Sequence, residues 1–284
     1  MEIIVGKNSG FCSGVSYTVK KAYEIVQKLP NVYSLGELVH NERVISDLER
    51  EGMITVHNIL DIPSFSTVIF RAHGESLNTY QIAKEKNLNI IDLTCGKIKV
   101  IRNKIEKKKK DHFILIIGKK NHPETIGTLS FSGKYSFIVE SQADLQEACQ
   151  FIEQSPFKQV YIVSQTTFSS SLFDLIVSSL MNQSSYEINV DKTICDATEK
   201  RQNEVKNLSL KVDKMIIVGG KNSSNTKELY KLAKENLDDV FFIQEVSDLD
   251  FSYFTNLDTV GIMAGASTPY QIVQEIIVEL NKII

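Results

Sequence analysis

Short apolar runs alternate with amphipathic stretches along almost the whole chain. The apolar runs are rich in Ile, Val and Phe, which favours β-strands. The longer stretches have helical spacing; Ile98, Ile101 and Ile105, for example, would form one apolar stripe on a helix. The predicted strands include Glu2–Val5, Thr67–Phe70, Asn89–Asp92, Phe113–Ile117, Val160–Val163, Met215–Val218 and Thr259–Met263, and the predicted helices include Ser16–Gln27, Lys97–Lys109, Ser141–Glu153 and Thr226–Glu235.

This alternation predicts an α/β fold with parallel sheets, because parallel strands need a crossover connection that is usually a helix. Ligands bind such sheets at the carboxyl ends of the strands. The polar segments expected there repeat one order three times: a cysteine, then two polar loops. The cysteines are Cys12, Cys95 and Cys195, and the loops are Leu35–Asn41, Phe70–Gly74, Gly118–Glu124, Ser164–Thr167, Gly219–Thr226 and Ala264–Pro269.

The repeat predicts three small parallel-sheet α/β domains in a pseudo-threefold trefoil, with the three cysteines meeting at its centre. The predicted domains are residues 1–95, 96–192 and 193–284. The third domain would lack one strand if each domain ended at the strand before the next cysteine. We therefore expect Glu2–Val5, from the N-terminus, to join the sheet of the third domain.

Composition narrows the class of protein. The chain has 284 residues, a net charge of −3 and no basic surface suited to nucleic acid. No apolar run approaches the ~20 residues that a membrane span needs. The N-terminal residues lack the features of a signal peptide, and four widely spaced cysteines do not suggest a disulfide scaffold. These features predict a cytoplasmic protein that binds neither nucleic acid nor membrane.

The three repeated cysteines each stand between a predicted strand and a predicted helix. A thiol at a helix N-terminus is shifted toward thiolate, the form that binds metal or attacks carbon. Three soft ligands suit an iron–sulfur cluster with one iron open to substrate, whereas a structural zinc site would show closely spaced pairs of ligands. The alternatives are three small buried apolar residues, or a nucleophile elbow at Gly10–Gly14, which should follow several strands rather than the first. Cys149 lies on an apolar helical face and is expected in the core.

Three of the five histidines stand in strand-end loops beside Asn or Gly. These are His40, His73 and His122, and their rings can donate hydrogen bonds to an anion. His57 and His112 lie in or beside strands without polar neighbours, so surface or edge positions are expected for them.

Other polar residues in these loops suit an anion and a proton transfer. Ser223, Ser224 and Asn225 open a helix and could cradle a phosphate; the alternative is an ordinary polar loop capped by Thr226. Ser267 occupies a similar helix start, where Thr268 is the alternative cap.

Glu124 follows Pro123 in the first turn of a helix. Its carboxyl group either compensates the helix dipole or serves as an acid with a raised pKa. Thr166 and Thr167, on another strand-end loop, could pass that proton on or hold a substrate hydroxyl.

At this point the residues match a known family along essentially the whole chain. The chain resembles the 4-hydroxy-3-methylbut-2-enyl diphosphate reductases, which catalyse the last step of the non-mevalonate isoprenoid pathway. The matching motifs are Gly10–Val15, Leu38–Asn41, Arg71–Gly74, Asp92–Cys95, Asn121–Glu124, Ser164–Thr167, Ile194–Thr198, Asn222–Thr226 and Ala264–Ser267.

The resemblance implies a cofactor and a set of site residues. Cys12, Cys95 and Cys195 would hold a [4Fe–4S] cluster, from which oxygen can strip iron to leave a [3Fe–4S] or an apo form. Glu124 would supply protons, and either Thr166 or Thr167 would link it to the substrate oxygen. The diphosphate would be held by His40, His73, His122, Ser223, Ser224, Asn225 and Ser267.

The resemblance also implies the reaction. The substrate hydroxyl would bind the unique iron and leave as water after two electrons arrive one at a time from an external donor such as ferredoxin or flavodoxin. Protonation at either end of the allylic system would give isopentenyl or dimethylallyl diphosphate.

Two other classes of function remain open from the residues alone. A cluster-based or zinc-based sensor would explain the cysteines but not the anion-binding loops, and a phosphate-ligand binding module would contain no iron.

Overall fold

The computed structural model describes residues 1–183 and 186–283 of the chain. The described chain divides into two compact units. The first unit contains Met1–Val19, Val39–Arg50 and the segment from Asp196 onward, and the second contains Lys20–Leu38 and Glu51–Cys195.

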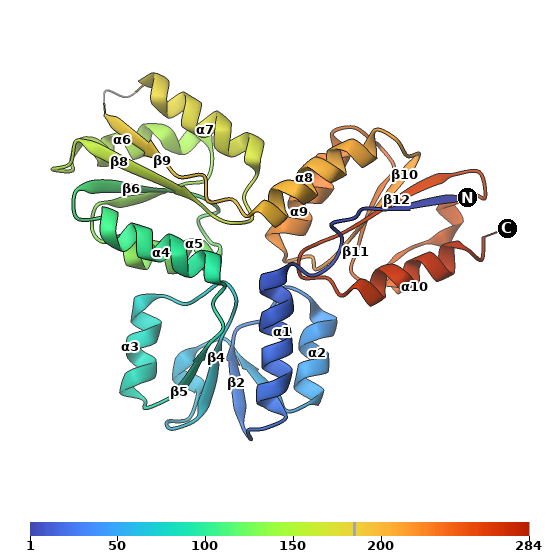
Figure 1. Ribbon diagram of the computed structural model, residues 1–284, viewed down its shortest axis with the longest axis horizontal. Coiled ribbons are helices and arrows are strands. Elements are labelled where there is room, and N and C mark those ends of the chain that lie inside the picture. Colours follow the sequence, from blue (N-terminus) through green and yellow to red (C-terminus); the bar gives the residue numbers. More distant parts are fainter. Residues whose placement is uncertain (184–185, 284) are drawn as a thin grey trace. The chain divides into compact units, whose positions relative to one another are not determined.

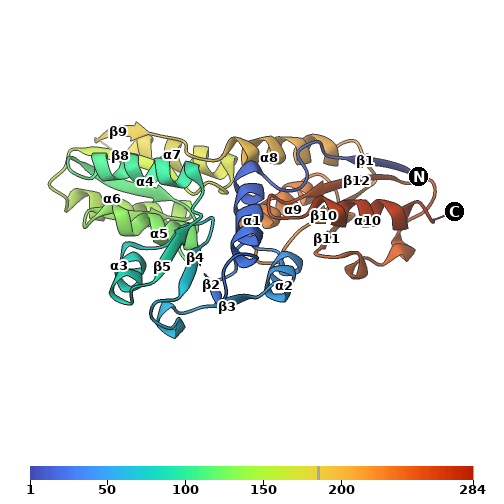
Figure 2. The same ribbon diagram turned by 60° about the horizontal axis from the view of Figure 1, so that its bottom comes forward.

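The first unit is built on one four-stranded parallel sheet with the order β1-β12-β10-β11. Its strands are β1 (Glu2–Val5), β10 (Lys214–Val218), β11 (Val240–Ile243) and β12 (Thr259–Ala264). β1 pairs with β12 from Glu2, opposite Thr259, to Val5, opposite Ile262, and Figures 1 and 2 show the two strands side by side. The N-terminal strand therefore joins the sheet formed by the C-terminal segment, as the sequence analysis expects.

Helices cover both faces of this sheet because the apolar side chains of its strands point alternately to either side. Ile216 and Val218 pack with helix α10 (Tyr270–Leu280), whereas Met215 and Ile217 pack with helices α8 (Asp196–Ser209) and α9 (Ser224–Lys234). The helices of this unit are α2 (Glu42–Arg50), α8 (Asp196–Ser209), α9 (Ser224–Lys234) and α10 (Tyr270–Leu280), and the short 3-10 turns are η3 (Val246–Asp248) and η4 (Phe251–Tyr253). Helix α1 (Ser13–Val26) begins in the first unit, directly after Cys12, and ends in the second.

The second unit contains two further parallel sheets, with the orders β3-β2-β4-β5 and β7-β6-β8-β9. The strands of the first are β2 (Val32–Leu35), β3 (Met53–Val56), β4 (Thr67–Phe70) and β5 (Asn89–Asp92), and those of the second are β6 (His112–Ile117), β7 (Ser136–Val139), β8 (Gln159–Ser164) and β9 (Glu187–Val190). The remaining elements are η1 (Ile59–Asp61), α3 (Leu77–Glu85), α4 (Gly96–Lys108), α5 (Pro123–Ser132), η2 (Gln142–Asp144), α6 (Leu145–Glu153) and α7 (Ser170–Gln183).

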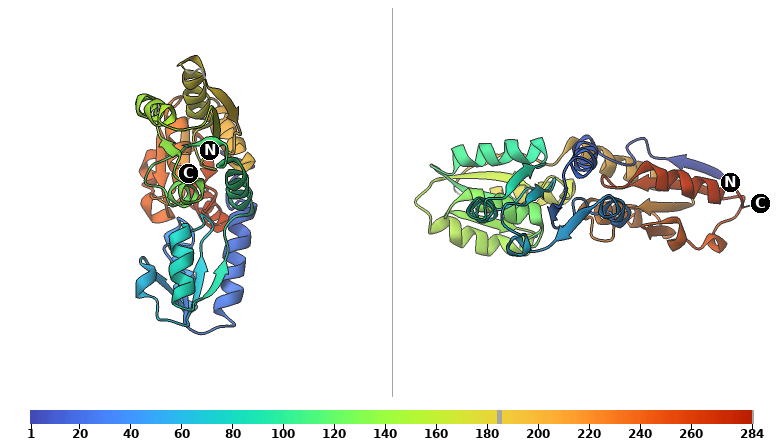
Figure 3. Two further views of the ribbon diagram at one scale, coloured as in Figure 1. Left: turned by 90° about the vertical axis from the view of Figure 1, so that its left-hand side faces the viewer. Right: turned by 90° about the horizontal axis from the view of Figure 1, so that it is seen from below.

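The sheet of β6–β9 is sandwiched between helices. Phe113, Leu115 and Ile117 face α6 and α7, whereas Ile114 and Ile116 face α4 and α5. Figure 3 shows this layering, with the green helix α4 on one side of the sheet and the yellow-green α6 on the other. The apolar stripe predicted for Lys97–Lys109 thus lies on the sheet: Ile98, Ile101 and Ile105 are all buried in α4.

All three sheets share one strand order. In each, the strand that precedes a cysteine is an edge strand (β1, β5 or β9), and its only neighbour (β12, β4 or β8) ends in one of the polar loops. The predicted α/β class, with three parallel sheets flanked by helices, is therefore confirmed. The trefoil arrangement and the domain boundaries at 95/96 and 192/193 stay predictions.

Two local predictions were wrong. The helix predicted for Ser141–Glu153 begins as the 3-10 turn η2, and α6 starts only at Leu145, because Ser141 and Asp144 form a capping box that fixes the first turn. His112 is not a surface residue. It is 3% exposed, and its ring nitrogens lie 2.5 Å from Asp111 Oδ1 and 3.4 Å from Lys108 Nζ.

Candidate functional site

Each of the three repeated cysteines is fixed in the same way to the sheet that carries it. The backbone N–H of Cys12 donates to the carbonyl of Ala266 at 3.1 Å, that of Cys95 to Ala72 at 2.9 Å, and that of Cys195 to Thr166 at 2.9 Å. In every case the acceptor lies in the polar loop at the end of the neighbouring strand. The three thiols therefore occupy equivalent positions on three separate sheets.

The surroundings of these thiols fit metal ligands rather than core residues. None of the three forms a disulfide within the described residues, all are half-buried, and each stands immediately before a helix (α1, α4 or α8). The backbone N–H of Val15 donates to Cys12 Sγ at 3.5 Å. Cys149 differs: it packs against the core between the sheet and α6, as expected, and burial raises the pKa of its thiol.

The loop that carries Cys12 is held by two residues of α8 that the sequence analysis did not select. Arg201 is buried, and its guanidinium donates to the carbonyl of Gly10 at 2.6 Å. The carboxylate of Glu204 accepts from the backbone N–H of Lys7 at 2.5 Å and of Asn8 at 2.9 Å. Helix α8 therefore fixes the segment between β1 and Cys12 from both ends.

Glu124 is a buried acid with a direct hydroxyl partner. It is 3% exposed and lies in the first turn of α5. Its carboxyl group accepts from Thr166 twice, from the backbone N–H at 2.6 Å and from Oγ1 at 2.7 Å. Burial raises the pKa of Glu124, and the two hydrogen bonds from Thr166 and the charge of Arg102 act in the opposite direction. Thr167 makes a different contact: its hydroxyl accepts from Gln165 Nε2 at 2.9 Å.

The raised pKa of Glu124 predicts a pH-dependent stability. The folded chain holds this proton more tightly than the unfolded chain, so the stability that the carboxyl contributes is complete below its ordinary pKa of 4.5 and is lost as pH rises through the folded pKa. We expect urea unfolding to show that the stability of Glu124→Gln relative to wild type increases as the pH rises from 4.5 to 8. A stability difference that does not change with pH would contradict a raised pKa.

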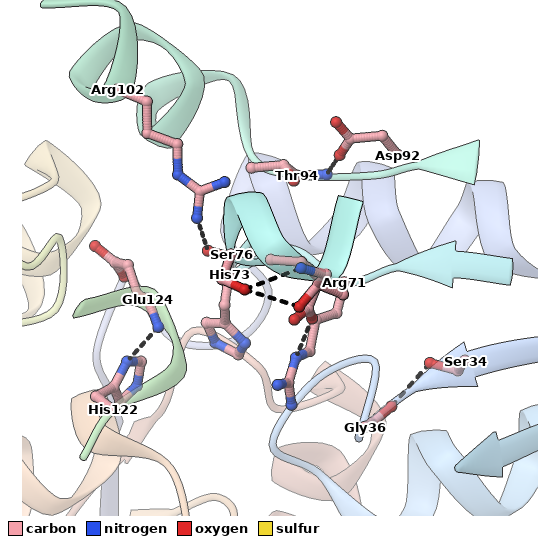
Figure 4. Close-up of polar contacts among 12 residues, drawn as sticks. Ser34, Gly36, Arg71, His73, Ser76, Asp92, Thr94, Arg102, His122 and Glu124 are labelled. Atoms are coloured by element: carbon pink, nitrogen blue, oxygen red, sulfur yellow. Dashed lines mark hydrogen bonds and ion pairs between the residues drawn. The ribbon is translucent and has the colours of Figure 1, made fainter. Parts of the chain in front are cut away.

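His73 and His122 lie together in the second unit. Their ring centroids are 5.3 Å apart in an edge-to-face arrangement. His122 is the N-cap of α5, and its Nδ1 accepts from the backbone N–H of Glu124 at 3.2 Å. Figure 4 shows the two imidazoles side by side, with Glu124 extending from the turn next to His122. The cap fixes Nδ1 as an acceptor, so a proton on this ring resides on Nε2.

The loop after β10 forms the start of helix α9 in the first unit. Ser223, not Thr226, is the N-cap, and its hydroxyl accepts from the Thr226 N–H at 3.2 Å. Thr268 is not a cap either, because its hydroxyl donates to the carbonyl of Val218. Asn225 is 4% exposed, yet neither polar atom of its amide has a hydrogen-bond partner in the described chain. Buried amides are normally hydrogen-bonded, so this one suits a polar ligand.

His40 lies against the other two polar loops of the first unit. Its carbonyl accepts from Ser267 Oγ at 3.2 Å. Gly220 lies so close to the same carbonyl that a Cβ there would collide with it. These contacts place His40 beside the loop of Ser223, Ser224 and Asn225.

The predicted site residues thus form two groups. The first unit holds Cys12, His40, Ser223, Ser224, Asn225 and Ser267, and the second holds Cys95, Cys195, His73, His122, Glu124, Thr166 and Thr167. Arg102, Arg201 and Glu204 were missed, since each reads as an ordinary charged residue of an amphipathic helix. No helix in residues 1–183 or 186–283 has the length and apolar composition to cross a membrane.

Known proteins resemble this chain over its full length. The family model described as LytB protein matches residues 3–281. Proteins named 4-hydroxy-3-methylbut-2-enyl diphosphate reductase include one from Caldanaerobacter subterraneus subsp. tengcongensis, 36% identical over 100% of this chain and 98% of its own. Another, from Clostridioides difficile, is 36% identical over 100% of both chains.

Solved structures agree in fold. The E-1-hydroxy-2-methyl-but-2-enyl-4-diphosphate reductase from Plasmodium falciparum matches with a TM-score of 0.90 and 32% identity, over 99% of this chain and 88% of that one. A second structure, of an (E)-4-hydroxy-3-methyl-but-2-enyl diphosphate reductase, matches with a TM-score of 0.71 and 34% identity over 100% of both chains. The chain therefore belongs to the LytB family, the family of the 4-hydroxy-3-methylbut-2-enyl diphosphate reductases.

Proposed function

We propose that this chain catalyses the reductive dehydroxylation of 4-hydroxy-3-methylbut-2-enyl diphosphate to isopentenyl and dimethylallyl diphosphate. The observation that carries the proposal is the equivalent anchoring of Cys12, Cys95 and Cys195 on three sheets, together with a buried acid, Glu124, bonded to Thr166. The names of the relatives support the same activity. We assign the reaction to the cytoplasm, where thiols stay reduced.

The three anchored cysteines would hold a [4Fe–4S] cluster. Three thiolates are one fewer than the four irons, so one iron would keep a position for the substrate hydroxyl. When bound, the cluster would supply the substrate with two electrons, taken one at a time from an external donor such as ferredoxin or flavodoxin. The protein's own contribution is to hold each thiol at the start of a helix, with its backbone anchored to the neighbouring strand-end loop.

The diphosphate would be bound by the histidines and the helix-start loops. His40, His73 and His122 offer ring N–H groups, and Ser267 offers a hydroxyl from the loop after β12. Ser223, Ser224 and Asn225 surround the first turn of α9, and the N-terminus of a helix favours an anion through its dipole. These donors are neutral or titratable, so binding depends on many hydrogen bonds rather than on a cluster of arginines.

Glu124 would supply protons through Thr166. The reaction consumes two protons and two electrons, and releases the hydroxyl oxygen as water. Because burial raises its pKa, the carboxyl group of Glu124 retains a proton more readily than an exposed one. Glu124 can give this proton to Thr166 Oγ1, 2.7 Å away, while the threonine passes its own hydroxyl proton to the substrate oxygen.

The proposed function is tested by turnover under anaerobic conditions. Iron-loaded protein is incubated with the substrate and a one-electron reductant, and the products are separated by chromatography. We expect both isopentenyl and dimethylallyl diphosphate, and neither when the reductant is omitted. Iron-loaded protein that leaves the substrate unchanged would contradict the proposed reductase activity and favour a cluster-based sensor. Protein that takes up no iron would favour a phosphate-ligand binding module.

Asn225 provides a separate test of the anion site. We expect Asn225→Asp to weaken binding of inorganic diphosphate about 10- to 100-fold, because a buried donor to the anion is replaced by a negative charge. Isothermal titration calorimetry measures the dissociation constant. Asn222→Asp is the matched control, since it puts the same charge on an exposed residue of the same loop. Equal weakening by both variants would mean that general repulsion, not a contact of Asn225, is responsible.

A further inference from the structure

Arg102 is a buried charge in helix α4, close to the candidate site of the second unit. It is 5% exposed. Its Nη2 donates to the carbonyl of His73 at 3.4 Å, and its guanidinium lies over the ring of Phe131, 4.7 Å from the centroid. Figure 4 shows the side chain reaching from α4 toward the backbone at His73, with Glu124 on the neighbouring helix.

Two glycines make room for this guanidinium. A Cβ at Gly74 would lie 2.6 Å from Arg102 Nη1, and a Cβ at Gly127 would lie 2.5 Å from Nη2. The same Cβ at Gly127 would also lie 3.3 Å from the carbonyl oxygen of Gly74. Gly74 directly follows His73, and Gly127 lies one turn after Glu124 in α5. Arg102 therefore occupies the junction between the His73 loop and the helix that carries His122 and Glu124.

The junction is rich in ionisable groups. Burial raises the pKa of Glu75 and of Glu124. Arg71, paired with Glu75 at 3.1 Å, opposes the effect on Glu75 more than Arg102 does. For Glu124, the positive charge of Arg102 adds to the opposing hydrogen bonds from Thr166. Burial likewise lowers the pKa of Arg102, and nearby Asp92, Glu75 and Glu124 counteract it. Tyr80, Arg71, His73 and His122 are further titratable groups near this junction, and Lys99 of α4 pairs with Asp92 at 3.3 Å. Arg102 is thus a countercharge to two buried acids, Glu75 and Glu124.

We propose that Arg102 is a positioning residue, which holds the loop of His73 against the first turns of α5 and so orients His73, His122 and Glu124 for reaction. The inference rests on the proposed function. A guanidinium suits this role because it is planar and can donate to the His73 carbonyl while stacking on Phe131. Lysine keeps the positive charge, but its ammonium group has neither the several coplanar N–H donors nor the planar face of a guanidinium.

The test compares three changes at the junction in the iron-loaded enzyme. We expect Arg102→Gln to lower kcat on the order of 10²-fold, because small misplacements of reacting groups have effects of this size. Arg102→Lys should also lower kcat, since it loses the geometry. Gly127→Ala should act like Arg102→Lys, because the added methyl displaces the guanidinium and leaves its charge in place.

The pH profile separates positioning from general damage to the fold. The rate should fall as pH rises through the pKa of the acid, Glu124. Removing the positive charge of Arg102 raises the pKa of Glu124. In Arg102→Gln the alkaline limb of the pH profile, where the rate falls with rising pH, should therefore move to higher pH. In Arg102→Lys, which keeps the charge, this limb should stay in place. Ile105→Val, a buried change in the same helix, should leave the limb and kcat near the wild-type values, as should the exposed control Arg50→Gln.

Two results would overturn the inference. One is an Arg102→Gln enzyme with wild-type iron content, kcat and pH profile. The other is a loss of kcat in Arg102→Gln without any movement of the pH limb, which would indicate a structural role only. Both results are informative only if the wild-type protein converts the substrate. If iron-loaded wild-type protein shows no turnover, the proposed function itself is overturned.

Discussion

Replacing Glu124 with glutamine is expected to lower turnover by about 10²- to 10⁴-fold, the usual loss when a positioned general acid is removed. Glutamine preserves the shape of the side chain, and its amide oxygen can still accept from the Thr166 N–H, as the carboxyl group does at 2.6 Å. What the amide cannot do is give up a proton at neutral pH. The measurement is kcat with a chemical reductant under anaerobic conditions, alongside the iron content.

The matched control for this change is Glu187→Gln, which removes the same charge from an exposed strand residue. We expect its kcat to equal that of wild type. Iron content should be the same in both variants and in wild type, since neither residue is a proposed ligand. A Glu124→Gln enzyme that keeps kcat within a few-fold of wild type would eliminate Glu124 as the proton source.

Replacing Cys95 with serine is expected to remove both the cluster and the activity. A serine hydroxyl is a much weaker ligand for iron than a thiolate, and the two remaining cysteines leave the cluster with half of the usual four cysteine ligands. Iron analysis and the visible absorption of the anaerobically reconstituted protein measure the loss directly. We expect Cys12→Ser and Cys195→Ser to behave in the same way, because all three residues are anchored equivalently.

Cys149→Ser is the internal control for these variants. Its thiol packs on the core beside α6 and has no part in the proposed cluster. It should keep full iron content and colour, with only a modest loss of stability from placing a hydroxyl beside apolar side chains. Iron retained in Cys95→Ser, or lost in Cys149→Ser, would contradict the assigned ligand set.

The sequence was informative where one pattern repeats along the chain. Ile-rich runs such as Phe113–Ile117 identified the central strands, because fully buried strands are nearly continuous apolar segments. The four-residue strands β2, β3, β7, β9 and β11 were not identified, although β1, β4 and β5, of the same length, were. Segments this short carry little periodicity, so their detection depends on a favourable composition. The cysteines were found because their placement recurs three times.

Roles that depend on contacts distant in sequence were not predictable. Arg102 stands in a lysine-rich helix, and only the space left by Gly74 and Gly127 makes it a buried residue. Similarly, the sequence left Thr166 and Thr167 equivalent. The fold distinguishes them, because the loop after β8 turns the Thr166 hydroxyl toward Glu124 and the Thr167 hydroxyl toward Gln165.

The pairing of β1 with β12 has a consequence for biosynthesis. Cys12 is translated long before the strand beside β1 and the carbonyl that accepts its N–H, which belong to residues 259–266. Contacts of such long range form late, after nearly all of the polypeptide has been translated. If Cys12 is a cluster ligand, as proposed, it would therefore reach its final position only after residues 259–266 have been translated.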